Sequence, residues 1–282
     1  MLVVLTVLMI SAMVTVSDTS SDVMPGVTVT MGPEGLKGEK RVLADGLATQ
    51  EECDMLLDLF QVGANAYFQG IHIFSDFEAV HGMEANEAAQ LAQQGVVPVD
   101  SADKFLTLSE KARQFTHAYF GLEQELYIQF THLVCRTAEP YSTDDRKDLS
   151  HKIHADSCEL NFTDWTCKPY PPHSGPLHKR DYSSILFLND EFKGGKFFFS
   201  DRNLTAEATV QPRCGRLVAF SSGPENPHGV QAVLQGRRCA LAMWYTLDKQ
   251  HDERIRHEAR TIVDSLRESA ELQEQEDQKK EL

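Results

Sequence analysis

Short runs of aromatic and β-branched residues, separated by turn residues, follow one another from about residue 126 to residue 246. Residues of these types are enriched in β-strands, and the pairs Asn189-Asp190 and Gly194-Gly195 are typical of turns. Several short strands at this spacing favour a β-sandwich or a β-barrel. The strand-like runs cover residues 126–134, 182–188, 196–200, 208–211, 216–220, 230–234 and 238–246.

Helical patterns precede these strands. Thr49 is followed three residues later by Glu52, a spacing typical of a capping box, and apolar residues then recur at helical spacing over 55–60. Thr107 and Glu110 have the same spacing and predict a second helix that ends near residue 120. We therefore expect a mainly β fold with flanking helices.

The composition divides the chain into four segments. Residues 1–17 contain an apolar, uncharged run that fits a signal peptide and is short for a membrane span, although a buried strand is the alternative. Residues 18–40 are rich in Ser, Thr, Gly and Pro and are expected to form a linker. Residues 41–250 are expected to form one domain, and residues 251–282 an acidic tail that is helical or disordered.

Other features favour a secretory route. Asn161 and Asn203 begin Asn-x-Thr triplets, which are acceptors for N-glycosylation. The last four residues, KKEL, resemble the KDEL-type signal that retains proteins in the endoplasmic reticulum. We expect a protein of the endoplasmic reticulum lumen with no stable membrane span, secreted if the KKEL end is not retained.

Cysteine count and charge limit the partners. Six cysteines form an even set, which permits disulfides in an oxidising compartment, and Cys158 and Cys167 are the pair that we expect first. A formal net charge of −15 repels phosphate backbones, so we expect no nucleic-acid partner.

A triplet at the start of the strand-rich half could bind a metal ion. In a strand, residues two apart face the same side, so the imidazole of His154 and the carboxylate of Asp156 can chelate one ion. Two histidines and one carboxylate on one face of an octahedron form the facial triad of non-haem iron(II) oxygenases. The triplet alone is a weak signal, because a chain of this composition contains about one by chance.

A second segment supplies the missing groups. His228 precedes one strand-like run, and Arg238 begins the next. An arginine can hold a carboxylate through two parallel hydrogen bonds, as the distal end of a 2-oxoglutarate cosubstrate requires. We therefore expect His228 to be the third metal ligand and Arg238 to bind 2-oxoglutarate.

From about residue 26 to residue 252 the sequence resembles the catalytic domain of the collagen prolyl 3-hydroxylases, the leprecan group. The segments that carry this resemblance are RVLADGLATQEEC, THLVCRTA, DLSHKIHADSC, RDYSSILFLND, GGKFFF, CGRLVAFSSGPENPHGV and GRRCALAMWYTLD. The resemblance implies a double-stranded β-helix (jelly-roll) core and iron ligands at His154, Asp156 and His228. It also places the 2-oxoglutarate-binding arginine at Arg238.

The resemblance further implies an activity and its requirements. It implies 3-hydroxylation of proline in procollagen chains, with Fe(II), 2-oxoglutarate, O₂ and L-ascorbate, and a place in a collagen-modifying chaperone complex. Alternatives are a prolyl 4- or lysyl hydroxylase, or a non-catalytic collagen-chaperone subunit. A cupin-like metal protein is a third reading, which would have more histidine ligands.

The sequence departs from the family pattern in two features, and three further residues are candidates for the cosubstrate pocket. The helical, cysteine-containing repeats that precede the catalytic domain in this family have no counterpart here, and Phe187 replaces a tyrosine that often donates to 2-oxoglutarate. We expect Tyr182, Ser184 and Trp244 to line the cosubstrate pocket, although each of them could be a packing residue.

Overall fold

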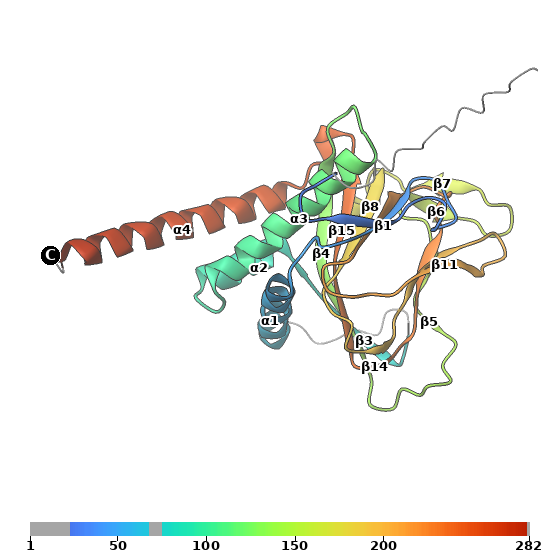
Figure 1. Cartoon of the computed structure of the whole chain (residues 1–282), viewed down its shortest axis with the longest axis horizontal. Coiled ribbons are helices and arrows are strands. Elements are labelled where there is room, and N and C mark those ends of the chain that lie inside the picture. Colours follow the sequence, from blue (N-terminus) through green and yellow to red (C-terminus); the bar gives the residue numbers. More distant parts are fainter. Residues whose placement is uncertain (1–22, 68–74, 281–282) are drawn as a thin grey trace, which may run out of the picture.

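Two β-sheets face each other in the computed structural model, which describes residues 23–67 and 75–280 (Figure 1). The larger sheet comprises β1 (Thr28–Met31), β2 (Arg41–Asp45), β3 (Glu78–Glu84), β4 (Tyr127–Ala138), β8 (Tyr182–Phe187), β12 (Leu217–Ser221) and β15 (Arg237–Thr246). The smaller sheet comprises β5 (Leu149–His154), β10 (Phe197–Ser200), β11 (Ala206–Val210) and β13 (His228–Gln231). Two short pairs join β6 (Cys158–Leu160) to β7 (Cys167–Pro169) and β9 (Lys193–Gly194) to β14 (Val233–Gln235).

The eight core strands form a jelly roll. The strand order is β1-β2-β12-β8-β15-β4-β3 in the larger sheet and β11-β10-β13-β5 in the smaller one. From β4 to β15 the chain crosses repeatedly between the sheets, so that β4, β8, β12 and β15 oppose β5, β10, β11 and β13. This confirms the predicted fold class, a mainly β structure with a double-stranded β-helix core.

Strand β15 lies in the interior of the larger sheet, and the run from Cys239 to Tyr245 on it is apolar. It pairs antiparallel with β4 on one side and β8 on the other. Leu241 and Met243 face the helices, whereas Ala240, Ala242 and Trp244 line a cavity between the sheets. The strand thus supplies one wall of the interior and the floor on which the helices pack.

Three helices cover the outer face of the larger sheet, and a fourth, α4, packs on α2 and α3 and projects away from the sheet (Figure 1). They are α1 (Gln50–Tyr67), α2 (Ala85–Gln93), α3 (Val99–Tyr119) and α4 (Arg254–Lys280). Their apolar side chains and those of the sheet form one hydrophobic core, and the aromatic residues between the sheets form a second. Two 3-10 turns, Gly175–Leu177 and Lys249–His251, complete the described elements.

The predicted capping box at the start of α1 is confirmed. Thr49 Oγ1 accepts a hydrogen bond from the Glu52 amide, and the Glu52 carboxylate accepts one from the Thr49 amide. The second helix, α3, ends at Tyr119, near the predicted end. Its predicted start is wrong, because α3 begins at Val99, and Thr107 lies inside it with its hydroxyl bonded to the Lys104 carbonyl. The helix begins earlier because Pro98 ends the preceding turn.

Parts of both terminal segments lie outside the described residues, and the N-terminal linker segment differs from the sequence-based expectation. The expected signal peptide falls in residues 1–22, outside the described residues, as do Glu281 and Leu282. Within the segment expected to be a linker, residues 28–31 form β1 and the side chain of Leu36 is fully buried, because β2 offers an unpaired edge. The tail is the long helix α4.

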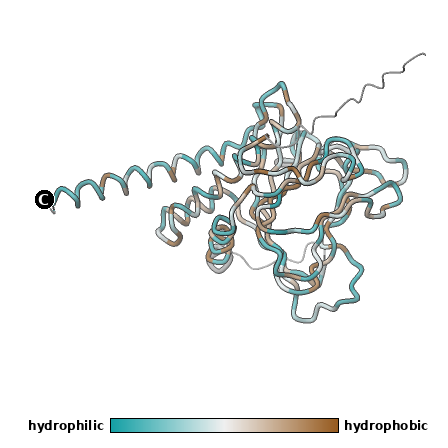
Figure 2. Tube along the Cα trace, viewed as in Figure 1, coloured by the Kyte–Doolittle hydropathy of each residue, from teal (hydrophilic) through white to brown (hydrophobic). Residues whose placement is uncertain are grey.

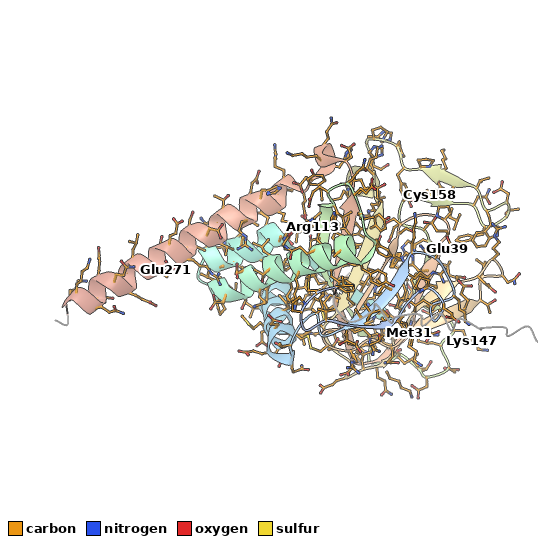
Figure 3. All side chains as sticks on the ribbon, turned by 45° about the horizontal axis from the view of Figure 1, so that its top comes forward. Met31, Glu39, Arg113, Lys147, Cys158 and Glu271 are labelled. Carbon is orange, nitrogen blue, oxygen red and sulfur yellow. A yellow bond between two sulfur atoms is a disulfide. The ribbon has the colours of Figure 1, made fainter. Side chains whose placement is uncertain are left out.

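Helix α4 extends beyond the rest of the molecule. Ala259 and Val263 are buried against the neighbouring helices, whereas the hydrophilic end carries exposed charges such as Glu271 (Figures 2 and 3). Among the described residues, none of the helices has the length and apolar character that crossing a membrane requires.

Three disulfides join the cysteines. The expected pair Cys158–Cys167 is confirmed and closes the β6–β7 hairpin. Cys53–Cys214 ties α1 to the loop before β12, and Cys135–Cys239 joins residues directly opposite each other on β4 and β15. The last of these holds together the two strands that carry much of the site.

Candidate active site

Two histidines meet across neighbouring strands of the smaller sheet. His154 is the last residue of β5, His228 is the first residue of β13, and the two are directly opposite in the antiparallel register. Their ring centroids are 4.4 Å apart. Strand pairing alone therefore places two imidazoles at one point, although they are far apart in sequence.

Asp156 completes a group of three ligands. Its Oδ1 lies 3.3 Å from His154 Nε2 and its Oδ2 lies 3.6 Å from His228 Nε2. The three ligand atoms lie within 4.8 Å of one another. Ligands at about 2.1 Å from one ion and at right angles are about 3 Å apart, so these side chains can share a metal ion.

Hydrogen bonds orient all three side chains. The Nδ1 atom of His154 is 2.8 Å from the Lys152 carbonyl oxygen, and that of His228 is 3.0 Å from the Asn226 carbonyl oxygen. A carbonyl oxygen only accepts, so each Nδ1 carries the proton and each Nε2 presents a lone pair to the site. Ser183 Oγ donates to Asp156 Oδ2 at 2.7 Å.

The protonation states suit a metal ion. Burial lowers the pKa of His228 to about 4, so its imidazole is neutral at neutral pH. Burial alone would raise the pKa of Asp156, but His228, His154 and Arg180 hold it well below its usual value. A neutral imidazole and an ionised carboxylate are the forms that coordinate metals.

A cavity of about 260 Å³ extends from these ligands between the two sheets. Its inner end contains Arg238, which is 3% exposed and whose Nε donates to the Gly195 carbonyl oxygen at 2.9 Å. Burial lowers the pKa of Arg238 to about 9, which leaves it charged at neutral pH. Its Nη2 atom is buried without a hydrogen-bond partner among the described residues, so the cavity presents a cation with an unused donor.

A second cavity of about 360 Å³, here called the outer cavity, shares His154, Asp156 and Trp244 with the first, the inner cavity. Besides His154 and Asp156 it is lined by Tyr170, Arg180 and Trp244. The guanidinium carbon of Arg180 lies 4.2 Å from the centroid of the Trp244 ring. The ligand group thus lies where two cavities meet, one with a cationic end and one lined by aromatic residues.

Comparison with known proteins identifies this arrangement. Residues 145–246 match the 2OG-Fe(II) oxygenase superfamily, and this range contains His154, Asp156, His228 and Arg238. The chain is 46% identical over 246 residues to prolyl 3-hydroxylase 3 of Mus musculus. The chain is a homologue of the prolyl 3-hydroxylases with a 2OG-Fe(II) oxygenase domain.

Other relatives of this oxygenase domain bear related names. Prolyl 3-hydroxylase 1 of Gallus gallus is 43% identical, and prolyl 3-hydroxylase 2 of Mus musculus is 40% identical. These three alignments cover 84–86% of this chain but only 33–34% of each relative. The chain therefore spans about a third of the length of the relatives that it matches.

The cofactors of the superfamily fit the residues present. Fe(II) takes nitrogen and carboxylate ligands, which the three oriented side chains supply. 2-Oxoglutarate needs a cation beyond the metal, and the buried donor of Arg238 stands at the inner end of the cavity. Fe(II), 2-oxoglutarate and O₂ are thus the cofactors that the superfamily implies and that this site can hold.

The other three residues that we expected in the cosubstrate pocket differ in their positions. Trp244 lines both cavities and stacks on Phe130, at 5.6 Å between ring centroids. Ser184 borders the inner cavity, but its hydroxyl is 2.6 Å from Tyr245 Oη, on the helix side of the sheet. The prediction for Tyr182 is wrong, because its ring packs on Phe120 in the core under the helices.

Strand alternation explains these positions. Ser183 faces Asp156, so its neighbours in β8 face the opposite side of the sheet. Phe187 has the same parity as Ser183, and the Arg238 guanidinium lies 5.2 Å from its ring centroid. Counting back in twos from Phe187 would have identified Ser183.

Several residues of the site were not predicted from sequence. Arg136 and Arg180 are buried and line the inner and outer cavities, respectively. His151 lies on β5, and its ring centroid is 4.2 Å from that of His154. His132 lines the inner cavity, and burial lowers its pKa to about 4, so it is a neutral member of the wall.

Proposed function

We propose that this chain uses Fe(II), 2-oxoglutarate and O₂ to hydroxylate C3 of prolyl residues in procollagen-type chains. The observation that carries the proposal is one cluster in which the three oriented ligands and a buried arginine face the same cavity. The names of the relatives supply the prolyl residue and its C3 position, and the procollagen-type chain comes from the family resemblance of the sequence.

Three residues of the site would bind the iron ion, and other groups orient these ligands. His154, Asp156 and His228 would hold the iron, with Ser183 and two backbone carbonyl groups fixing their directions. Bound iron supplies the oxidative chemistry, in which 2-oxoglutarate is converted to succinate and CO₂ while O₂ provides the new hydroxyl oxygen. The protein contributes fixed ligand geometry and a largely apolar surrounding.

Arg238 would bind the distal carboxylate of 2-oxoglutarate. Its Nε is held by the Gly195 carbonyl oxygen, which leaves the Nη side of the fork for the ligand. Phe187 lies against the guanidinium and cannot donate a hydrogen bond. Recognition of the carboxylate therefore depends on charged donors, which form stronger hydrogen bonds than a neutral tyrosine.

The outer cavity is our candidate for the prolyl residue. Trp244, Tyr170 and Leu177 give it flat and apolar walls next to His154 and Asp156. A pyrrolidine ring is an apolar, compact group that packs well on aromatic faces. Arg180 at the same cavity can donate to a backbone carbonyl group of the substrate.

We also propose that the chain works in the lumen of the endoplasmic reticulum, with ascorbate as a reductant. The three disulfides suit an oxidising compartment. Both glycosylation triplets, at Asn161 and Asn203, have exposed asparagines in surface turns. Membership of a collagen-modifying chaperone complex is part of the same proposal.

Product identification tests this function. Purified protein is incubated with Fe(II), ascorbate, 2-oxoglutarate and peptides that contain Gly-Pro-4-hydroxyproline triplets, and the hydroxyl positions are located by mass spectrometry. We expect 3-hydroxyproline with equimolar succinate. Hydroxyl groups on C4 of proline or on lysine would contradict the proposed specificity. Absence of succinate would instead favour a non-catalytic chaperone subunit.

A further inference from the structure

A third cavity, of about 440 Å³, neighbours the outer cavity, and we call it the flanking cavity. The lining residues that bear on its chemistry are Glu84, Gln129, Phe130, Asp252, Glu253 and Arg254. The Phe130 ring stacks on Trp244, which lines the outer cavity, at 5.6 Å between ring centroids. The 3-10 turn Gly175–Leu177 contributes its first residue to the flanking cavity and its last to the outer cavity. One stack of two rings and one turn therefore separate the two cavities.

Gln129 offers an open hydrogen-bond acceptor at this cavity. The pairing of β4 with β15 shifts between Trp244 and Tyr245, which leaves Gln129 as the extra residue of a bulge. Bulges redirect side chains and are frequent beside active sites. Gln129 is 8% exposed, and its Nε2 donates to the His178 carbonyl oxygen at 3.3 Å. Its Oε1 is buried and has no hydrogen-bond partner among the described residues, which indicates a donor that arrives with a ligand.

The charges around this acceptor are mostly negative. The carboxylates of Glu84, Asp252 and Glu253 line the flanking cavity. Arg254 also lines it, but its side chain is 87% exposed and pairs with Glu258 at 3.5 Å. Burial raises the pKa of Glu253, and the charge of Glu84 raises it further, so these carboxylates repel each other. A cation placed in the cavity would offset this repulsion.

The ligand that fits is an extended organic cation rather than a metal ion. Among the residues that the structure describes, His154, Asp156 and His228 form the only group whose ligand atoms lie close enough to share an ion. The acceptors of the flanking cavity come instead from the residue before α2, the bulge of β4 and the segment before α4. Lysyl and arginyl side chains carry several donors on a long apolar stem, which can lie along the Phe130 ring.

We propose that the flanking cavity binds a lysyl or arginyl side chain of the substrate polypeptide, close in sequence to the prolyl residue that is hydroxylated. This inference rests on the position in the outer cavity that we proposed above for the prolyl residue. The stacked rings between the cavities are 5.6 Å apart. An extended or polyproline II chain rises about 3 Å per residue, so we place the cation about two to four residues from the prolyl residue. The enzyme would thus select prolyl residues by the charge of their neighbours.

Peptide binding and peptide turnover test the inference together. A neutral peptide with Gly-Pro-4-hydroxyproline triplets receives Lys, Gln or Glu at each position flanking the target prolyl residue in turn. Affinity is measured by fluorescence anisotropy on Mn(II)-loaded protein, and 3-hydroxyproline is measured by mass spectrometry after turnover with Fe(II). We expect Lys at one position to bind about fivefold more tightly than Gln, and Glu to bind more weakly than Gln.

Variants of the flanking cavity locate the effect. Glu84→Gln and Asp252→Asn each remove a charge and keep an acceptor oxygen, and each should at least halve the preference for Lys over Gln. Gln129→Leu removes the open acceptor and should lower the preference as well. Glu271→Gln is the matched control, because this carboxylate is exposed on α4 and lies outside the cavity. The control should keep the full preference.

Each outcome supports or contradicts a definite part of the account. The absence of any Lys preference, or a preference that survives all three cavity variants, would overturn the inference and leave the proposed reaction intact. Equal weakening of the Lys and Gln peptides by these variants would indicate a merely structural role and would also overturn it. The expected charge preference in binding without any 3-hydroxyproline would refute the proposed reaction and leave the flanking cavity as a site for cationic peptides.

Discussion

The imidazoles of His154 and His228 face each other from the ends of adjacent antiparallel strands, with their Nδ1 atoms bonded to carbonyl groups of their own chain segments. This relationship makes the smaller sheet a rigid support for two metal ligands. Asp156 lies two residues after the end of β5, and its carboxylate reaches the same point. The geometry of the site is therefore set mainly by strand register.

Ser183 is expected to support metal binding. Its hydroxyl donates to Asp156 and is 2.7 Å from Ser222 Oγ, in a buried environment. Removing such a bond to a ligand typically lowers metal affinity by about 10- to 100-fold. We expect Ser183→Ala to show this loss in a Mn(II) titration followed by electron paramagnetic resonance.

The neighbouring serine provides the control for that experiment. Ser184 bonds to Tyr245 on the helix side of the sheet. Ser184→Ala should leave Mn(II) affinity unchanged and lower the free energy of unfolding by about 1 kcal/mol. Similar Mn(II) affinities for the two variants would show that the Ser183 contact is unimportant.

Arg41 is expected to brace the segment that carries His228. It is fully buried, its Nε donates to Asn226 Oδ1 at 2.6 Å, and its Nη1 pairs with Glu207 at 2.7 Å. Arg41→Met leaves these acceptors without their donor, so we expect the free energy of unfolding to fall by about 2–3 kcal/mol in urea denaturation. Arg254→Met, at an exposed pair with Glu258, should change it by less than about 0.5 kcal/mol. Equal effects would argue against the brace.

Glu253 is expected to make stability depend on pH. Burial raises its pKa to about 7, although Thr131 and Arg256 favour the charged form. Because the folded state binds the proton more tightly, this stabilisation is complete below about pH 4.5 and is lost as the pH rises to about 7. The loss is about 3 kcal/mol.

Glu253→Gln should remove that part of the pH dependence. Unfolding free energies at pH 5 and pH 8 should differ less in this variant than in the original protein. Glu271→Gln, at an exposed site on α4 (Figure 3), should keep the original difference. An unchanged pH profile for Glu253→Gln would contradict the account.

The strands that the sequence predicted well are rich in aromatic and aliphatic residues. The run at 238–246 became β15, and the run at 182–188 became β8, each within one residue of the predicted ends. β5 was not predicted, because its sequence LSHKIH is mostly polar and its structure depends on pairing with β13. Strand propensity is weakest where side chains serve a site rather than a core.

The candidate site was predictable where spacing encodes geometry. His154 and Asp156 are two residues apart. His228 precedes one strand-like run, and Arg238 begins the next. Arg136 and Arg180 could not be placed, because only the paired register and the burial of the sheet bring them to the cavities. Tyr182 was misplaced because the direction of alternation in β8 was not fixed.

The shared ligation of one ion by His154, Asp156 and His228 is tested most directly by Asp156→Ala, assayed for Fe(II)-dependent succinate formation and for Mn(II) binding. Glu159→Ala is the matched control, because this carboxylate is exposed and lies three residues further on. We predict that Asp156→Ala loses both succinate formation and Mn(II) binding by at least about 100-fold, while the control keeps both. Normal succinate formation by Asp156→Ala would contradict the account.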